Sequence, residues 1–288
     1  MNIEEIKKEL KKHFIGKYDI PEVSSYIDDI NLFKIIKYKN LKIKLYYNTN
    51  DNLDIEFIKR VIKRGSLILK RKLMTIHLIP SPAKKILKED GIMTSENINS
   101  GFTYINRNDI YIFRKEEFPK VIIHELIHHD LNIHQDIFKE ENNKLLKKHF
   151  NIAESTKLIL NETIIELWAT ILQLAFVSID YKIEFRKLYK MELIYSLYKC
   201  HQIFKIQDGK EWIDECNIYC YIIFKTILLN YLNEFIKIYM YPNKYDDTLL
   251  TKFIIKYSKI PDIKKNPEFS KKINRPNNSL CFMLFSDY

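Results

Sequence analysis

Residues 121–130 read V-I-I-H-E-L-I-H-H-D, an apolar run that carries two histidines four positions apart. Positions i and i+4 share one face of an α-helix, so His124 and His128 can both turn an imidazole nitrogen toward one metal ion. Glu125 is rotated by about 100° from His124 and would lie beside that ion, where a general base takes a proton from water. Two histidines on an apolar helix can equally be packed core residues, so a third ligand has to distinguish the two interpretations.

Two residues are candidates for that third ligand. His134 lies six positions after His128, which is the spacing H-E-x-x-H-x-x-G-x-x-H of metzincins. That spacing needs a sharp turn at its glycine, and Leu131, which stands at this position, suits the turn poorly. Glu162 belongs to N-E-T-I-I-E-L-W-A (161–169), whose apolar neighbours indicate that its carboxylate is buried and needs a partner. The sequence therefore favours Glu162.

Glu166 follows Glu162 by one helical turn, on the same face of the expected helix. A carboxylate at this position can accept a hydrogen bond from the free nitrogen of a ligand histidine and fix its tautomer. His129, the second member of the H-H pair, is not expected to be a ligand. We expect His129 and Asp130 to lie at the surface, at the end of the helix, where Asp130 could hydrogen-bond a ligand.

H-E-L-I-H (124–128) followed by N-E-T-I-I-E (161–166) resembles the gluzincins. In their thermolysin-like members an N-E-x-x-x-D helix completes the zinc site, and Glu166 stands where that aspartate would. The run 162–172 is also similar to the E-x-x-A-N-x-F-A-x-x-L pattern of ImmA/IrrE-type metallopeptidases, which it keeps at two positions and leaves at three. The kept residues are Ala169 and Leu172, and the departures are Ile165, Glu166 and Trp168. The resemblance covers roughly residues 95–180.

This resemblance implies a zinc metallopeptidase in which Zn²⁺ is held by His124, His128 and Glu162, with Glu125 as the catalytic base. It also implies that the strand D-I-Y-I-F-R is similar to the zincin edge strand that pairs with an extended substrate, through Ile110, Tyr111, Ile112 and Phe113. The oxyanion donor in such enzymes is usually Tyr or His, and the candidates at a suitable distance after the Glu helix are Tyr195, Tyr198 and His201.

Hydrophobic periodicity indicates an α+β chain that is mostly helical. Strands are expected at 41–47, 73–79 and 108–114, and the rest of residues 1–70 is expected to be mainly helical. A short helix is expected at 83–89, followed by a polar loop through Gly101. Pro119 is placed in the first turn of the motif helix, which is expected to end near residue 131.

Further helices are expected at 135–149, at 157–178 with Ser155 or Thr156 as the cap, and after residue 182 until a Lys/Asn/Pro-rich tail from 260. We expect a zincin-like catalytic core with a small mixed sheet, divided as 1–70 (N-terminal helical or mixed region), 71–180 (catalytic core) and 181–288 (helical elaboration).

The overall composition limits which binding partners and which cellular compartment are expected for the chain. The formal net charge is +10, but the lysines are spread along the whole chain and arginine is scarce, so a specific nucleic-acid footprint is not expected. The N-terminus lacks the apolar core of a signal peptide. The most apolar late stretch, 217–232, is interrupted by Lys225 and is expected to be a buried core helix rather than a membrane span. We expect an intracellular enzyme that acts on a protein or peptide substrate.

The four cysteines, Cys200, Cys216, Cys220 and Cys281, follow no disulfide or zinc-ribbon spacing. Cys216 and Cys220 lie one helical turn apart, and they are either a metal pair or, as is more usual, small core residues with free thiols. Three alternatives to the gluzincin interpretation stay open: a metzincin-type peptidase with His134 as third ligand, a non-catalytic protein stabilised by zinc, and a basic helical protein without metal.

Overall fold

The structure is a computed structural model that describes residues 2–14, 18–69, 73–88, 92–104, 107–131, 139–241, 246–261 and 279–285. The chain is an α+β protein, mostly helical, with one mixed five-stranded sheet. It divides into two compact units, which are described separately. Unit 1 comprises Met1–Lys85, Ser95–Asp130 and Ser286–Tyr288, and unit 2 comprises Ile86–Thr94 and Leu131–Phe285. The division into 1–70, 71–180 and 181–288 stays a prediction.

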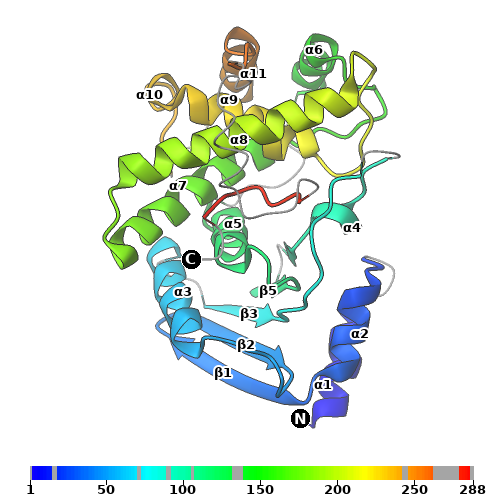
Figure 1. Cartoon of the computed structure of the whole chain (residues 1–288), viewed down its shortest axis with the longest axis vertical. Coiled ribbons are helices and arrows are strands. Elements are labelled where there is room, and N and C mark those ends of the chain that lie inside the picture. The colour runs from blue at the N-terminus through cyan, green and yellow to red at the C-terminus, as the bar shows by residue number, and fades with distance from the viewer. Residues whose placement is uncertain are drawn as a thin grey trace. The chain divides into compact units, whose positions relative to one another are not determined.

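Unit 1 is built on the sheet, whose strand order is β1-β2-β3-β5-β4 (Figure 1). β2, β3 and β5 run parallel, whereas β1 and β4 pair antiparallel at the two edges. The strands are β1 (Leu32–Tyr38), β2 (Leu41–Tyr47), β3 (Met74–Leu78), β4 (Gly101–Thr103) and β5 (Asp109–Ile112). The strands expected at 41–47 and 73–79 are confirmed, and that at 108–114 is confirmed as a shorter strand. β1 was not anticipated, and Gly101 begins a strand instead of lying in a loop.

Helices cover both faces of this sheet. The helices are α1 (Ile3–Phe14), α2 (Pro21–Asp29), α3 (Ile55–Ile68), α4 (Ser95–Ile98) and α5 (Phe118–Leu131). Phe14 of α1 packs edge-on against Phe102 and Phe113, within an aromatic cluster that also contains Tyr111. The alternate residues of the sheet face α3 and α5.

Helix α3 approaches the motif helix closely at a glycine. A Cβ on Gly65 would lie 2.9 Å from Leu126 Cδ1 of α5 and 3.0 Å from Leu41 Cδ1 of β2. Three elements of unit 1 therefore meet at this point, and α5 is held against the sheet along an apolar face that includes Ile122, Ile123, Leu126 and Ile127, all at most 1% exposed.

A cluster of buried charges fixes the start of α5. Lys85 donates its ammonium to Glu117 Oε2 at 2.6 Å, and the two side chains are 2% and 0% exposed. The backbone amide of Lys85 donates to Glu116 Oε2 at 2.8 Å. Glu117 itself has φ +60°, and α5 begins at the next residue, with Pro119 in its first turn as predicted. The position of the motif helix therefore depends on an ion pair buried beneath its first turn.

The same ion pair explains why the helix expected at 83–89 is wrong. Residues 83–88 form no helix and have a single bridge at Ile86, because Lys85 bonds Glu117 and the carbonyl of Lys84 accepts a bond from the Arg114 guanidinium at 2.6 Å. Side-chain contacts that lie about thirty residues away in sequence thus override the local helical pattern.

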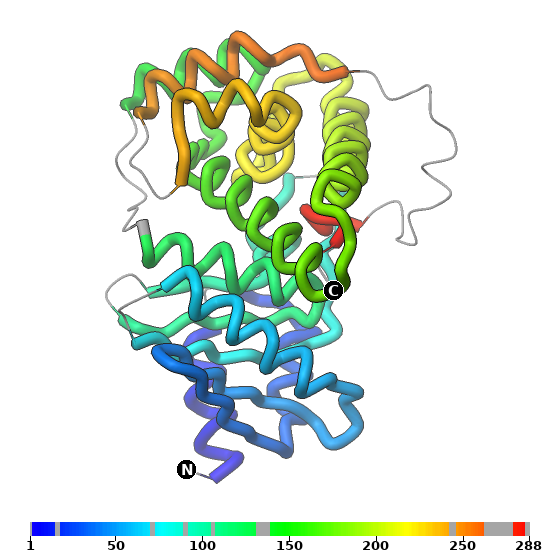
Figure 2. Tube along the Cα trace, turned by 90° about the vertical axis from the view of Figure 1, so that its left-hand side faces the viewer, coloured from blue at the N-terminus to red at the C-terminus, as the bar shows by residue number. Residues whose placement is uncertain are grey.

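Unit 2 is helical. Its elements are α6 (Glu140–Phe150), α7 (Asn161–Tyr181), α8 (Phe185–Gln207), a π-helical segment η1 (Tyr219–Phe224), α9 (Lys225–Asn230), α10 (Leu232–Phe235) and α11 (Asp247–Lys256). Figure 2 shows α7 and α8 side by side, and they pack against each other and against α9. The buried core helix expected at 217–232 is confirmed as the η1–α9 pair, most of whose side chains are buried.

The cap predicted for α7 is wrong. Thr156 is buried and uses its hydroxyl elsewhere, accepting from the Asp214 amide at 3.3 Å and donating to the Trp212 carbonyl at 3.3 Å. The helix begins only at Asn161, without a side-chain cap. Within the described ranges, α7 is also the helix that is long and apolar enough to cross a membrane by length and composition, with 61% of its most apolar window buried in the protein.

Candidate metal centre

Helix α5 presents the two motif histidines on one face, as the i, i+4 spacing predicts. Nε2 of His124 and Nε2 of His128 are 3.2 Å apart. His124 and Glu125 are buried, at 8% and 7% exposed, and His128 is partly buried. The apolar residues of the helix, among them Ile122, Leu126 and Ile127, pack into unit 1.

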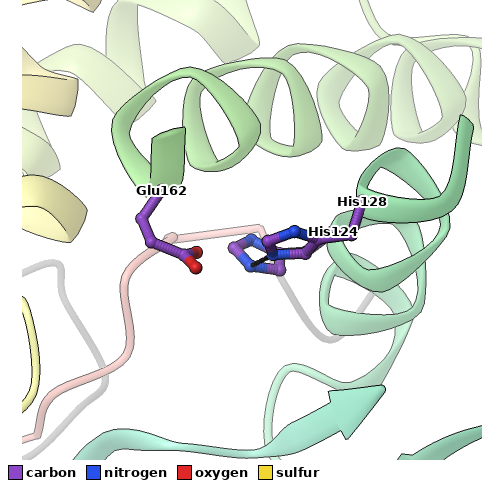
Figure 3. A group of neighbouring side chains, drawn as sticks. All are labelled: His124, His128 and Glu162. Carbon is purple, nitrogen blue, oxygen red and sulfur yellow. Dashed lines mark hydrogen bonds between the residues drawn. The ribbon is translucent and has the colours of Figure 1, made fainter. Parts of the chain in front are cut away.

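Glu162 lies in the first turn of α7 and is 5% exposed. The structure places one ligand atom each of His124, His128 and Glu162 within 4.8 Å of one another. Figure 3 shows the carboxylate of Glu162 directed toward the two imidazoles. In the part of the chain that the structure describes, this is the one group of three or more His, Cys, Asp or Glu side chains with such spacing.

The donor set and the spacing of its two imidazole nitrogens are compatible with a zinc ion. Tetrahedral zinc with Zn–N bonds of about 2.0–2.1 Å holds two nitrogens roughly 3.3 Å apart, close to the 3.2 Å between the imidazoles. Two imidazoles and one carboxylate are also a ligand set found in catalytic zinc sites, which keep the fourth position open. The group can thus hold a metal ion, and its chemistry suits zinc.

The two other carboxylates of the prediction are both buried. Glu125 follows His124 on α5, and Glu166 lies one turn after Glu162 on α7 with an exposed fraction of 1%. Such burial requires each carboxylate to be partnered. The role of Glu125 as base and that of Glu166 in orienting a histidine stay predictions.

The prediction that β5 is an edge strand is wrong. β5 pairs with β3 on one side and with β4 on the other, so Ile110, Tyr111 and Ile112 lie inside the sheet. The amide of Phe113 is also engaged, donating to the Ser100 carbonyl at 2.9 Å. The edge next to β5 is β4, a three-residue strand that the sequence did not indicate because its residues, Gly101, Phe102 and Thr103, are too few to alternate.

A contact from α5 to this edge strand was also missed. His129, expected at the surface, is partly buried and its Nε2 contacts the Thr103 hydroxyl of β4. That hydroxyl donates its one hydrogen to the Asp109 carbonyl at 3.2 Å, so the imidazole Nε2–H is the donor to Thr103. Asp130 is exposed. The H-H pair was the available sequence signal, since its second member had no assigned role.

The three candidate oxyanion donors all lie on α8. Tyr195 is fully buried and donates its hydroxyl to the Cys281 carbonyl at 2.8 Å, within the core of unit 2. The Tyr198 hydroxyl accepts from Gln202 Nε2 at 3.0 Å, and His201 Nε2 lies 3.1 Å from the Pro261 carbonyl. Their role as donors stays a prediction. His134, the alternative third ligand, lies outside the described residues.

The cysteines are free thiols buried in unit 2. Cys216 and Cys220 are in different surroundings. Cys216 follows the buried Asp214, whose carboxylate accepts its amide at 2.8 Å, whereas Cys220 lies in η1. Burial raises the pKa of both thiols above the usual range, which keeps them protonated and poor ligands. The interpretation as small core residues is thus favoured.

A second buried histidine lies on the opposite face of the sheet from α5. The His77 ring is stacked between Tyr46 and Tyr111, with Nδ1 2.9 Å from the Tyr46 hydroxyl and Nε2 3.3 Å from Asp109 Oδ1. Burial, followed by the positive charge of Lys44, lowers the pKa of His77 to about 4, although Asp109 opposes the shift. This imidazole is therefore neutral at pH 7.

We compared the chain with protein-family models, with curated proteins and with solved structures, and none of them matches it.

Proposed function

We propose that the protein is a zinc-dependent metallopeptidase. The observation that supports it best is the convergence of His124, His128 and Glu162 within 4.8 Å, with a buried glutamate, Glu125, next to the first histidine. This residue set is the one that the gluzincin resemblance implies. A zinc ion bound there would acidify a water molecule and polarise the carbonyl of a peptide bond.

Each side chain has a distinct task in this proposal. His124, His128 and Glu162 would hold the ion. Glu125 takes the proton from the attacking water and delivers it to the leaving amine. Glu166 orients a ligand imidazole.

The peptide substrate is proposed to bind along β4. In the described part of the sheet, β4 pairs only with β5, so the backbone groups on its other side can pair with an extended peptide. His129 connects the motif helix to this strand through Thr103. An intracellular location is proposed with it, because the four cysteines are free thiols and intracellular proteins keep their thiols reduced.

Metal analysis tests the ligand set. We expect Glu162→Gln to lose most of its zinc after dialysis against a weak chelator, whereas the exposed-residue control Glu141→Gln retains one equivalent. His134→Ala is expected to retain zinc as well. If Glu162→Gln keeps full zinc while His134→Ala loses it, the site is of the metzincin type.

Turnover of peptides tests the reaction. Glu125→Gln is expected to keep its zinc and to lose peptide hydrolysis by about 10²–10⁴-fold, the usual contribution of a general base. Equal turnover by the wild type and this variant would contradict the catalytic role. A wild-type protein that binds one zinc but cleaves no peptide in a diverse library would instead favour a zinc-stabilised binding protein.

A further inference from the structure

Unit 2 contains a short segment outside its helices, Ser279–Phe285, which we call the tail segment. It follows residues 262–278, a stretch rich in Lys, Asn and Pro, and its sequence S-L-C-F-M-L-F is almost wholly apolar. All of its residues except the partly buried Leu284 are buried. In Figure 2 the segment, coloured red, lies beside α7 and α8.

The main chain of the tail segment is bound by side chains from three helices. Tyr195 of α8 donates to the Cys281 carbonyl at 2.8 Å, and Lys225 of α9 donates to the Phe282 carbonyl at 3.0 Å. Glu192 of α8 accepts from the Leu284 amide at 2.8 Å. The contacts that complete the set are Gln173 of α7 to the Phe285 carbonyl at 3.2 Å and Lys199 of α8 to the Ser279 carbonyl.

Three of these five side chains are ionisable and buried, since Glu192, Lys199 and Lys225 are at most 3% exposed. Glu192 and Lys225 are linked through Ser196, whose hydroxyl accepts from Lys225 Nζ at 3.0 Å and donates to Glu192 Oε1 at 3.4 Å. Charged groups in a helical core are costly, and apolar residues of similar volume would often be at least as stabilising. What the three side chains share is that each bonds the main chain of the tail segment.

The side chains of the tail segment occupy apolar surroundings. The Phe282 ring stacks on Tyr221, with centroids 5.2 Å apart. Met283 and Phe285 belong to a buried cluster with Leu174, Val177 and Leu188 of α7 and α8. Main-chain hydrogen bonds combined with apolar side-chain contacts are also the means by which receptors bind peptides.

We propose that α7, α8 and α9 form a binding site for a short apolar peptide, and that the tail segment occupies this site as an exchangeable ligand. The inference concerns unit 2 alone and does not depend on the metal centre. The occupant is the chain's own residues 279–285, bound chiefly through backbone carbonyls and one amide, so a second molecule carrying the same backbone and similar apolar side chains can replace it.

The test uses the full chain with a specific protease site inserted after residue 270. After cleavage, the tail fragment is expected to stay bound during gel filtration and to be replaced by an excess of a fluorescein-labelled peptide of residues 277–288. Unfolding upon cleavage, or failure of a hundredfold excess to exchange over several days, would show that the segment is a permanent part of the core and would overturn the proposal.

Two matched pairs test the main-chain contacts. A peptide N-methylated at Leu284 loses the amide that Glu192 accepts and is expected to bind about tenfold more weakly or worse, the usual effect of losing a charged hydrogen bond. Lys225→Met is expected to weaken binding of the labelled peptide to a similar extent. Lys205→Met, at an exposed position of the same unit, is expected to leave the binding affinity unchanged. Equal affinity for the methylated and unmethylated peptides would contradict main-chain recognition.

Hydrogen exchange on the unmodified chain provides a measurement without an inserted site. The amides of residues 280–285 are expected to exchange through an opening that leaves α7 protected, at least tenfold faster than the slowest α7 amides. Identical protection of the two segments would mean that they open only together, and the tail segment would then not be a ligand.

Discussion

Unit 1 and unit 2 both bury lysine side chains, but the ammonium groups have different kinds of partner in the two units. In unit 1 the buried Lys85 is paired with a buried carboxylate, Glu117, whereas in unit 2 the buried Lys225 is bonded to a hydroxyl and a main-chain carbonyl. The first arrangement joins two segments that precede α5, and the second joins helices to the tail segment. Loss of Lys85 should therefore remove the charged partner of a buried carboxylate in unit 1, whereas loss of Lys225 should remove the donor to a hydroxyl and a carbonyl in unit 2.

The largest effect is expected at the buried ion pair of unit 1. Lys85→Met leaves the Glu117 carboxylate buried without its ammonium partner, and it should lower the free energy of unfolding by about 3–5 kcal/mol. Urea denaturation at pH 7 measures it. Lys144→Met, which removes a fully exposed i, i+4 pair with Glu140, should give no resolvable change. A loss below about 1 kcal/mol for Lys85→Met would contradict the importance of charge pairing in unit 1.

Acid should destabilise unit 1 through His77. Its pKa is near 4 in the fold and 6.5 in the unfolded chain, so between these values the unfolded state binds more protons and stability falls as the pH decreases. The maximum slope is about 1.4 kcal/mol per pH unit. His77→Gln should flatten the dependence between pH 6.5 and 4, measured by urea midpoints. A slope identical to that of the wild type would show that His77 is not the responsible group.

The carboxyl group of Asp214 in unit 2 should give stability a pH dependence of the opposite sign. Burial raises the pKa of this carboxyl above 3.8, so the folded state holds the proton more strongly and stability falls as the pH rises through that higher pKa. The acid dependence of the two units can therefore be separated by comparing His77→Gln with Asp214→Asn.

A smaller effect is expected at Lys225. Lys225→Met removes the donor to the Ser196 hydroxyl and the Phe282 carbonyl, so two uncharged acceptors lose a bond and the free energy of unfolding should fall by about 1–3 kcal/mol. Lys205→Met is the matched control at an exposed site. A loss as large as that of Lys85→Met would remove the contrast between the units.

The smallest effects are expected at two glycines. Gly65→Ala in α3 places a methyl 2.9 Å from Leu126 Cδ1, but this contact is with a movable side-chain end and alanine favours the helix, so the net change should be below about 1 kcal/mol. Gly209→Ala in unit 2 meets no atom within 4 Å yet has φ +72°, which should cost about 1–2 kcal/mol. Thermal denaturation of both variants would show whether packing in unit 1 or backbone conformation in unit 2 is the stricter constraint.

The local sequence pattern was sufficient to predict the elements in which apolar side chains alternate with polar ones or recur at helical spacing. The strand at 41–47 was predicted because buried Leu41, Ile43 and Leu45 alternate with lysines, and α5 because Pro119 precedes a continuous apolar face. β1 was missed because it is an edge strand in which only Ile36 is buried, so its sequence shows little alternation of apolar and polar residues.

The errors occur where a distant partner decides the local conformation. Lys85 lies in a segment whose sequence pattern is helical, but its side chain bonds Glu117 and the segment forms no helix. Thr156 bonds residues 212 and 214 instead of capping α7. The candidate ligand group was anticipated from i, i+4 spacing and from a carboxylate in an apolar helix. The position of β4 at the sheet edge could not be anticipated, because strand order depends on pairings between segments far apart in the chain.

The tail segment has a consequence for the order in which the protein matures on the ribosome. All the helices and strands of unit 1 lie within the first 131 residues, whereas Glu192, Lys199 and Lys225 obtain their main-chain partners only when residues 279–285 have been made. At about 5–20 residues per second, roughly ten to thirty seconds separate these events. A nascent chain would therefore carry a folded sheet while the apolar residues of α7 and α8 that pack against the tail segment are still uncovered. Exposed apolar residues of this kind are what chaperones bind.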